Sequence, residues 1–416
     1  MHRIRPAAPN VSTTRLALVM AATLYLGSAA VLAQAPANLS LNDAVERAMA
    51  ANRTVMAART SHAIDVAGIS AARQRPNPEF SFEAERETPH WAFAGALPVE
   101  ISGKRQRRID VANATLAATD ADVARAIADV RVEVRRAYYQ TVAAVRRVTI
   151  AQELETLAGR ARDAAQDRFQ TGAAPRLEAL QAALALAQAQ NEVAVARGDV
   201  VAARAELNAL LAYPSDASPA LTDPLEAGPL PTAEAATTQA IAGNAELMTL
   251  QKQIDVERAK VALARAMRTP DPTVTTTLTY DAPGEFTYGW RFGAAMGIPI
   301  FTTGRAEVVV AEATLNRAIA TREARVAEIG GAVGAALARA TAARQAVDRF
   351  QNEILPASLQ IEQMADESYR AGQTGLPAYL QTVQAARDAR QRALQAGLDY
   401  QLALTDLERA MGTPLK

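Results

Sequence analysis

The feature of this sequence that most constrains its fold is a long internal duplication, in which the same residue pattern occurs twice at a spacing of about 200 residues. A turn reading Phe169-Gln170-Thr171-Gly172 in the first half returns as Tyr369-Arg370-Ala371-Gly372 in the second. The only two tryptophans, Trp91 and Trp290, each begin a W-x-F pattern that is followed by a proline and then a glycine. Solenoid repeats are usually roughly 20–50 residues long, so this spacing indicates a duplicated module instead. Each half is predicted to contain a helix, two short strands, a very long helix and a return helix.

The N-terminus has the pattern of a secretory signal peptide. Three arginines precede an apolar run over residues 16–32, which ends in small residues. We expect residues 1–33 to be removed by cleavage after Ala33, with Ala35 as the alternative site and an uncleaved membrane anchor as the alternative interpretation. Residues 34–213 then form the first repeat, the proline-rich stretch 214–231 a linker, and residues 232–416 the second repeat.

Composition excludes several classes of protein. The chain has no cysteine, which rules out disulfides, thiolate metal sites and a lipidated cysteine. Lysine plus arginine equals aspartate plus glutamate in number, so no general basic field exists to hold nucleic acid. Aromatic residues make up only 5% of the chain, which favours long helices packed side by side over one large compact core.

Four segments alternate between apolar and polar residues and are predicted to be strands: 79–85, 91–99, 273–280 and 286–296. The last of these is long enough to cross a bilayer when tilted, since about 9–11 residues suffice. An alternative is a hairpin that packs on helices in water. We predict that the aromatic residues of these strands face lipid: Phe80, Phe82, Trp91, Phe93, Phe286, Tyr288, Trp290 and Phe292.

Two very long helices follow the strands. Residues 104–171 contain no proline, and Ile109, Leu116, Val123, Val130 and Ala137 recur every seven residues, as in a supercoiled helix. Such a helix of roughly 65 residues would be about 100 Å long. The matching helix, 305–370, is expected to bend or bulge at Gly330-Gly331 and at Pro356.

Return helices are predicted to begin at Pro175 and Pro377, because proline is tolerated in the first turn. In the first of them Leu177, Leu180, Leu184 and Ala187 step by three and four residues. This spacing predicts the contact line of an antiparallel coiled coil.

Four strands cannot close a barrel, and an open sheet edge in lipid leaves unpaired backbone groups that cost several kcal/mol each. Three chains would supply twelve strands, enough for a barrel that holds water. The predicted fold is therefore mainly α with a small transmembrane β part. Long coiled-coil helices form an α-helical barrel that continues a 12-stranded β-barrel in a trimer, with four strands per chain.

No constellation for catalysis, metal binding or a cofactor is present in the sequence. His62 and His90 have no cysteine or second histidine at ligand spacing, and we expect a solvated helix face and a strand turn, respectively. The carboxylates are scattered along helices, where pairing with arginine is the ordinary explanation.

The signal peptide, the twofold repeat, the paired strands and the glycine-containing turns together resemble the TolC-like outer-membrane factors. This resemblance implies a passive channel in the outer membrane with a long periplasmic helical tube. It also implies a homotrimer that works with a periplasmic membrane-fusion (adaptor) protein and an inner-membrane efflux pump of the resistance–nodulation–division type. The alternative of another class is a periplasmic coiled-coil scaffold without a pore.

The segment Leu97-Pro98-Val99-Glu100-Ile101-Ser102-Gly103-Lys104-Arg105 is similar to an element of the cobalt–zinc–cadmium (CzcC-like) efflux branch, with Ser102 in place of a glycine. This resemblance implies divalent heavy-metal cations as the cargo. Drugs, small organic molecules or secreted proteins are the alternative cargoes.

The resemblance also implies roles for the two turns. They match the periplasmic tips that contact the adaptor, which gives these candidate residues: Arg168, Phe169, Gly172, Ala173, Tyr369, Arg370 and Gly372. Some relatives carry two aspartates that ring the closed entrance, whereas Ala378 and Gln381 occupy the matching positions here. Glu178 is the acidic residue of this entrance region in the first half, so an acidic ring is not expected.

Overall fold

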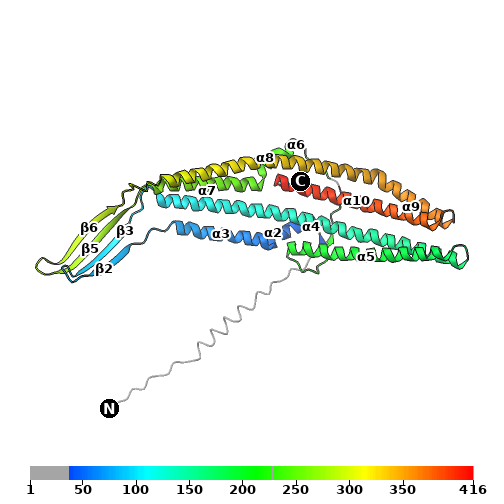
Figure 1. The fold of residues 1–416 in the computed structure, drawn as a ribbon, viewed down its shortest axis with the longest axis horizontal. Helices are drawn as coiled ribbons and strands as arrows, with labels where there is room; N and C mark the ends of the chain where they lie inside the picture. The colour runs from blue at the N-terminus through cyan, green and yellow to red at the C-terminus, as the bar shows by residue number, and fades with distance from the viewer. Residues whose placement is uncertain (1–36, 227, 416) are drawn as a thin grey trace, which may run out of the picture.

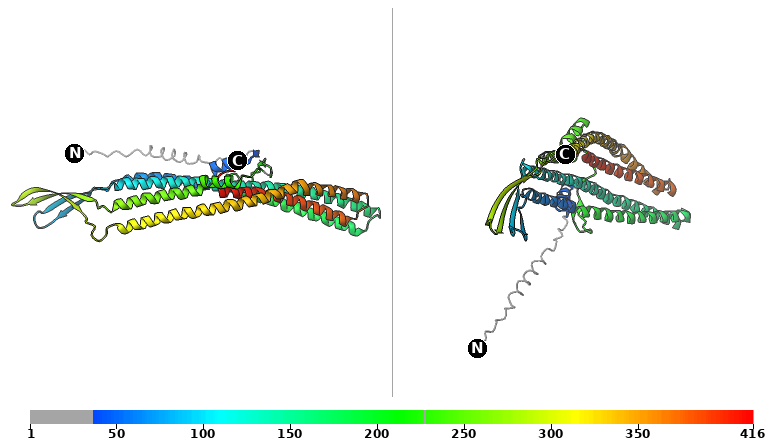
Figure 2. Two further views of the ribbon diagram at one scale, coloured as in Figure 1. Left: turned by 90° about the horizontal axis from the view of Figure 1, so that it is seen from above. Right: turned by 60° about the vertical axis from the view of Figure 1, so that its left-hand side comes forward.

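The computed structural model of a single chain describes residues 37–226 and 228–415. The predicted signal peptide and its cleavage sites lie outside these residues. The molecule is a long rod with a small sheet at one end and two helical hairpins at the other (Figure 1). The middle of the rod carries short elements on its surface, near the point where the two halves of the chain are joined (Figure 2).

The helices and strands follow the predicted order. The first half contains β1 (Asn38–Leu39), α2 (Leu41–Ala51), α3 (Arg53–Ala72), β2 (Glu79–Ala84), β3 (Trp91–Pro98), α4 (Lys104–Gln170) and α5 (Arg176–Leu211). The linker contains β4 (Ala220–Leu221). The second half contains α6 (Ala233–Gly243), α7 (Ala245–Met267), β5 (Pro272–Ala282), β6 (Phe286–Met296), α8 (Arg305–Arg349), the π-helix η1 (Phe350–Ile354), α9 (Leu355–Arg370) and α10 (Leu376–Met411).

The four long strands form one antiparallel sheet in the order β2-β3-β5-β6. Its register places Phe82 opposite Phe93, Phe93 opposite Leu278 and Leu278 opposite Trp290. Residues directly opposite one another share a face of the sheet, so the aromatic residues of all four strands lie on one face. The other face carries small and polar residues, as in the row Ser81, Ala94, Thr277 and Arg291. The predicted strands are therefore present, each within two residues of its expected ends.

The long helices lie side by side in one layer. In the half of the rod that ends in the two hairpins, on the right of Figure 1, the layer runs α9, α10, α4, α5, and the helical pairs that touch are α9 with α10, α10 with α4, and α4 with α5. Nearer the sheet, α7 takes the place of α10, and α3 takes the place of α5. Only α4 and the α8–α9 helix run the full length, because each of the other positions is filled by two helices placed end to end.

At these end-to-end junctions an asparagine precedes each of the helices nearer the sheet, α3 and α7. Asn52 accepts hydrogen bonds from the first N–H groups of α3, at Thr54 and Val55, and its amide donates to the carbonyl of Leu210 near the end of α5. Asn244 makes the same bonds at the start of α7, and its amide donates to the carbonyl of Ala410. Each asparagine therefore provides hydrogen-bond partners for the free N–H groups at the start of one helix and for a free carbonyl at the end of another.

The expected irregularity at Pro356 is present, and the one at Gly330-Gly331 is not. The π-helix η1 ends two residues before Pro356, where the proline ring would clash with a carbonyl of the preceding turn. The prediction at Gly330-Gly331 is wrong, since α8 continues through both residues without a break. Glycine lowers helix propensity by only about 1 kcal/mol, which the packing of a long helix outweighs.

The predicted leucine contact line of α5 is also wrong. Leu177, Leu180 and Leu184 are 57–63% exposed in the single chain. The contact between α4 and α5 instead uses small side chains: Ala158, Ala161, Ala165, Ala179, Ala182 and Ala189 are buried. Alanine lets the two helices approach closely, and the leucines are left on the outside of the chain.

The largest cluster of buried hydrophobic residues lies at mid-length, where the short strands β1 and β4 pair in parallel. The Tyr138 hydroxyl, on α4, lies 2.9 Å from the carbonyl of Leu39 and 2.7 Å from the carboxylate of Asp223. Burial raises the pKa of Tyr138 to about 12. Within residues 37–226 and 228–415, no helix combines the length and apolarity needed to cross a membrane.

Candidate functional site: the hairpin tips and the aromatic face of the sheet

The two hairpin tips have the same backbone geometry. Gly172 and Gly372 have positive φ angles of 76° and 70°, a conformation that glycine adopts without strain. In each tip, N–H groups after the glycine donate back to a carbonyl of the descending helix, that of Arg168 or of Ser368. No atom lies near the position of a Cβ on either glycine, so both are open to the outside.

A polar network joins the first tip to the second. The Arg168 guanidinium donates to the Glu178 carboxylate at 3.1 Å, and the Tyr369 hydroxyl donates to the same oxygen at 3.3 Å. The Arg168 guanidinium also lies over the Tyr369 ring, 5.5 Å from its centre. Glu178 is in the first turn of α5, where the helix dipole favours a negative charge.

Tyr369 continues the network within the second hairpin. Its ring stacks on Tyr379 with 4.8 Å between centres, and the Tyr379 hydroxyl donates to Asp366 at 3.2 Å. Burial, followed by the nearby Glu178 charge, raises the pKa of Tyr369, and burial raises that of Tyr379. Both tyrosines are therefore neutral hydrogen-bond donors over the physiological pH range.

The structure separates the predicted tip residues into two groups. Phe169, Gly172, Ala173, Arg370 and Gly372 are exposed at the end of the rod. Arg168 and Tyr369 face the other hairpin instead, and Tyr369 is only 3% exposed. Sequence reasoning missed Asp366 and Tyr379, although both lie one to three helical turns from the tip glycine. Gln381 is exposed on α10, and Glu178 belongs to the network rather than to a ring of free carboxylates.

All eight predicted lipid-facing aromatic residues lie on the aromatic face of the sheet and are more than a third exposed in the single chain. They stack on one another within this face, as Phe82 does on Trp91 and Trp290 on Phe292, with ring centres 5.5 and 6.2 Å apart. A continuous exposed aromatic surface of this kind requires an apolar covering.

The charged residues of the segment Leu97–Arg105 and its surroundings hold the strand-to-helix corner together. Lys104 is buried and pairs with Asp271 at 2.8 Å, and Asp271 also accepts a hydrogen bond from the N–H of Ile101. Glu100 pairs with Arg108. These contacts account for Glu100 and Lys104 as structural residues, with no ligand required.

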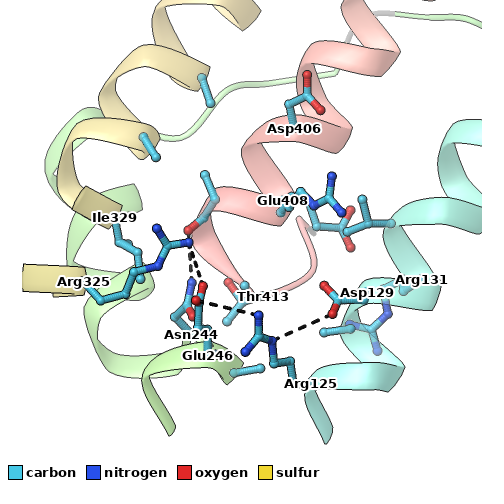
Figure 3. A pocket seen from close by; sticks show the side chains of 18 of the residues that line it. Arg125, Asp129, Arg131, Asn244, Glu246, Arg325, Ile329, Asp406, Glu408 and Thr413 are labelled. Carbon is cyan, nitrogen blue, oxygen red and sulfur yellow. Dashed lines mark hydrogen bonds and ion pairs between the residues drawn. The ribbon is translucent and has the colours of Figure 1, made fainter. Parts of the chain in front are cut away.

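A cavity of about 620 Å³ lies where α10 ends and α7 begins, between α4 and α8. Arg125 and Arg325 both point to Glu246, at 3.7 and 2.8 Å (Figure 3). Asp406 and Glu408 are paired with arginines on α4. The acidic residues of this cavity are thus already neutralised by arginine.

No group of three or more histidine or carboxylate side chains is placed to hold a metal ion among the residues that the structure describes. His62 is half-exposed and lies 3.6 Å from Asp120. His90 is in the β2–β3 turn, beside Asp281.

Comparison with known proteins decides the family. The model of the outer membrane efflux protein family matches residues 44–212 and 236–413, which together make up most of the chain. The chain belongs to the outer membrane efflux protein family. It is 26% identical over 386 residues to the cobalt-zinc-cadmium resistance protein CzcC of Cupriavidus metallidurans, covering 91% of each protein.

Solved structures of outer-membrane channels share the fold of this outer membrane efflux protein. The channel OprN has a TM-score of 0.73 at 19% identity, and the match covers 90% of this chain and 90% of OprN. CusC has a TM-score of 0.74 at 17% identity, with 90% of this chain and 92% of CusC covered. The Campylobacter jejuni channel CmeC has a TM-score of 0.73 at 17% identity, covering 89% of this chain and 85% of CmeC. The predicted fold class, the family and the outer-membrane location with a periplasmic helical tube are confirmed.

Proposed function

We propose that this protein is the outer-membrane duct of a tripartite efflux system and that its cargo is divalent heavy-metal cations. The observation that carries the cargo is the similarity to CzcC, a cobalt-zinc-cadmium resistance protein, along 91% of both chains. The duct is a passive homotrimer without catalytic activity, whose two repeats, 34–213 and 232–416, are joined by the linker 214–231. An adaptor protein contacts the duct, and an inner-membrane pump supplies the energy for export.

In this proposal the aromatic face of the sheet meets lipid and the polar face lines the pore. Threonine, alanine and glycine dominate the polar face, together with Glu79, Glu83 and Arg291. Such a lining offers cations weak, multiple contacts, and weak binding is what rapid passage requires.

The cargo is tested by deleting the gene. Loss of the duct should lower tolerance to zinc, cobalt or cadmium, and the intact gene should restore it. Calorimetry with the purified protein should show no metal binding tighter than roughly millimolar, about 4 kcal/mol. Unchanged metal tolerance with lost drug tolerance would assign the duct to organic cargo, and tight stoichiometric zinc binding would contradict a passive duct.

The exposed tip residues are proposed to meet the adaptor. A tryptophan at Gly172 or Gly372 would fill the open space beside the turn, so Gly172→Trp and Gly372→Trp should abolish export while the protein still reaches the outer membrane. The matched control is Gly172→Asn, because asparagine tolerates positive φ and adds little bulk. Normal export by both tryptophan variants would exclude the tips as the contact.

A further inference from the structure

The cavity where α10 ends and α7 begins has the dimensions of a binding site. Its volume of about 620 Å³ lies within the range of roughly 300–1,000 Å³ that small-molecule sites occupy. Four helices line it, namely α4, α7, α8 and α10 (Figure 3). The duct function proposed above does not require this cavity.

The space exists because two helices placed end to end meet here and their neighbours carry small side chains. α10 ends at Met411 and α7 begins at Ala245, with Asn244, Gly412 and Thr413 at the junction. The long helices on either side present alanines to the gap: Ala128 on α4, and Ala332, Ala335 and Ala336 on α8. Methyl groups are too small to fill the space, so room for a ligand remains between the two long helices.

The lining of the cavity contains more arginines than carboxylates. The arginines are Arg125, Arg131, Arg325, Arg339 and Arg409, and the carboxylates are those of Asp129, Glu246, Asp406 and Glu408. Two of the carboxylates are paired with arginines that lie outside the lining, Asp406 with Arg136 and Glu408 with Arg135. The other two pair with Arg125 and Arg325. All four carboxylates are therefore already engaged.

Three arginines of the lining have no carboxylate within ion-pair distance among the residues that the structure describes: Arg131, Arg339 and Arg409. They come from three different helices, α4, α8 and α10. Arg131 is half-buried, and the other two are exposed. A guanidinium group binds carboxylate or phosphate through two parallel N–H donors. Guanidinium groups from three helices around one cavity can therefore hold several oxyanion groups of one ligand.

A metal ion does not fit this cavity. Glu246 is paired with both Arg125 and Arg325, so a cation would have to displace an arginine from it. The described part of the chain also contains no group of three or more histidine or carboxylate side chains placed to hold a metal ion. The surplus of positive charge favours an anion instead.

We propose that this cavity binds a small polyvalent oxyanion, a molecule with two or more carboxylate or phosphate groups, through Arg131, Arg339 and Arg409. The bound anion links α4 of the first repeat to α8 and α10 of the second, at the height where α10 gives way to α7. A ligand that binds only the folded protein also raises its stability. The site does not depend on which cargo the duct carries.

The test uses the purified protein in detergent and metal-free buffer. Citrate is the probe for carboxylate groups, and pyrophosphate is the probe for phosphate groups. Calorimetry at constant ionic strength, set with sodium chloride, should show saturable binding of at least one probe in a ratio of one per chain, because general screening by salt has no stoichiometry. The same probe should raise the melting temperature. Binding of citrate alone would identify a polycarboxylate site, and binding of pyrophosphate alone a phosphate site.

Substitutions locate the binding. Arg131→Gln, Arg339→Gln and Arg409→Gln should each weaken binding roughly tenfold, because each removes a charge-assisted contact with the anion. None of the three side chains has an ion pair to lose within the described chain, so the variants should keep the mass of the unchanged protein. Arg317→Gln is the matched control, since Arg317 is exposed on α8 outside the cavity and its replacement removes the same charge.

Two results would overturn the site. Absence of saturable binding of both probes at millimolar concentration would show that the arginines are only solvated or are paired with carboxylates of another chain. Equal weakening by Arg317→Gln and by the three cavity variants would show a general attraction to positive charge and no site in the cavity.

Discussion

The contact between the two halves of the chain differs in chemistry from the two outer faces of the helical layer, which α5 and α9 form near the tips (Figure 1). The contact between the halves near the tips contains polar groups: Arg387 pairs with Glu192 at 2.7 Å, Arg390 lies 4.0 Å from Glu153, and the Tyr369 hydroxyl donates to Glu178 at 3.3 Å. On the outer faces, Leu180 and Leu184 of α5 and Ile361 of α9 are exposed in the single chain. A contact within one chain forms at high effective concentration and can use polar groups for specificity, whereas chains that meet after folding depend more on apolar burial.

The largest effect is expected from placing charge on the outer face of α5, which a second chain would cover in the proposed trimer. Leu180→Glu/Leu184→Glu should prevent assembly, because an unpaired charge buried at the interface costs about 3–5 kcal/mol. The measurement is the mass of the purified protein in detergent. Gln181→Glu adds a charge to the same helix at a position whose counterpart, Gln381, is exposed, and it should assemble normally. Normal assembly of the double variant would remove the distinction between the outer faces and the intrachain contact.

A smaller effect is expected at the polar intrachain contact. Glu178→Gln keeps the size of the side chain but removes the charge that Arg168 and Tyr369 share. Hydrogen bonds to a charged group contribute about 1.5–3 kcal/mol, so the two tips should separate roughly ten times more often. The trimer should persist, and its conductance in planar bilayers should rise. Disassembly of this variant would show that the polar contact also holds the chains together.

The smallest effect is expected at the corner between sheet and helix. There, one substitution would give the contact between chains the same ion pair that the contact within the chain has. Lys104 pairs with Asp271 inside the chain. The residues at the matching positions of the other repeat are Arg305, after Gly304, and Asn77, between Pro76 and Pro78. Asn77→Asp would supply the missing carboxylate between copies and should raise the temperature at which the trimer dissociates, because an exposed ion pair contributes about 1 kcal/mol or less. Asn77→Ser serves as the control without charge. An unchanged or lower dissociation temperature would argue against Arg305 facing Asn77 of the next copy.

Much of this fold could be predicted from the sequence, because the pattern that indicates each helix or strand occurs in both repeats. The strand with Trp290 and the helix after Gly103 begin within a residue or two of their expected positions. Alternation and proline are local signals that need no knowledge of the neighbouring chain. Helix starts are local in the same way: Ser40 precedes the first turn of α2, and its side chain accepts from the N–H of Asp43.

The features that the sequence did not reveal are contacts between distant segments and very short strands. The leucines of α5 have the spacing of a helix contact, but spacing does not say which helix they contact, and alanine occupies the inner face instead. The β1–β4 pair is only two residues long in each strand, too short for alternation to reveal. The Tyr369–Glu178 contact joins residues 191 positions apart, which a single sequence does not indicate.

In the proposed duct one chain is an incomplete part of a ring, and three copies complete it. Sedimentation equilibrium of the purified protein in detergent tests this most directly. We expect a single species with three times the mass of the mature chain, unchanged on dilution. A stable species with the mass of one chain would contradict it.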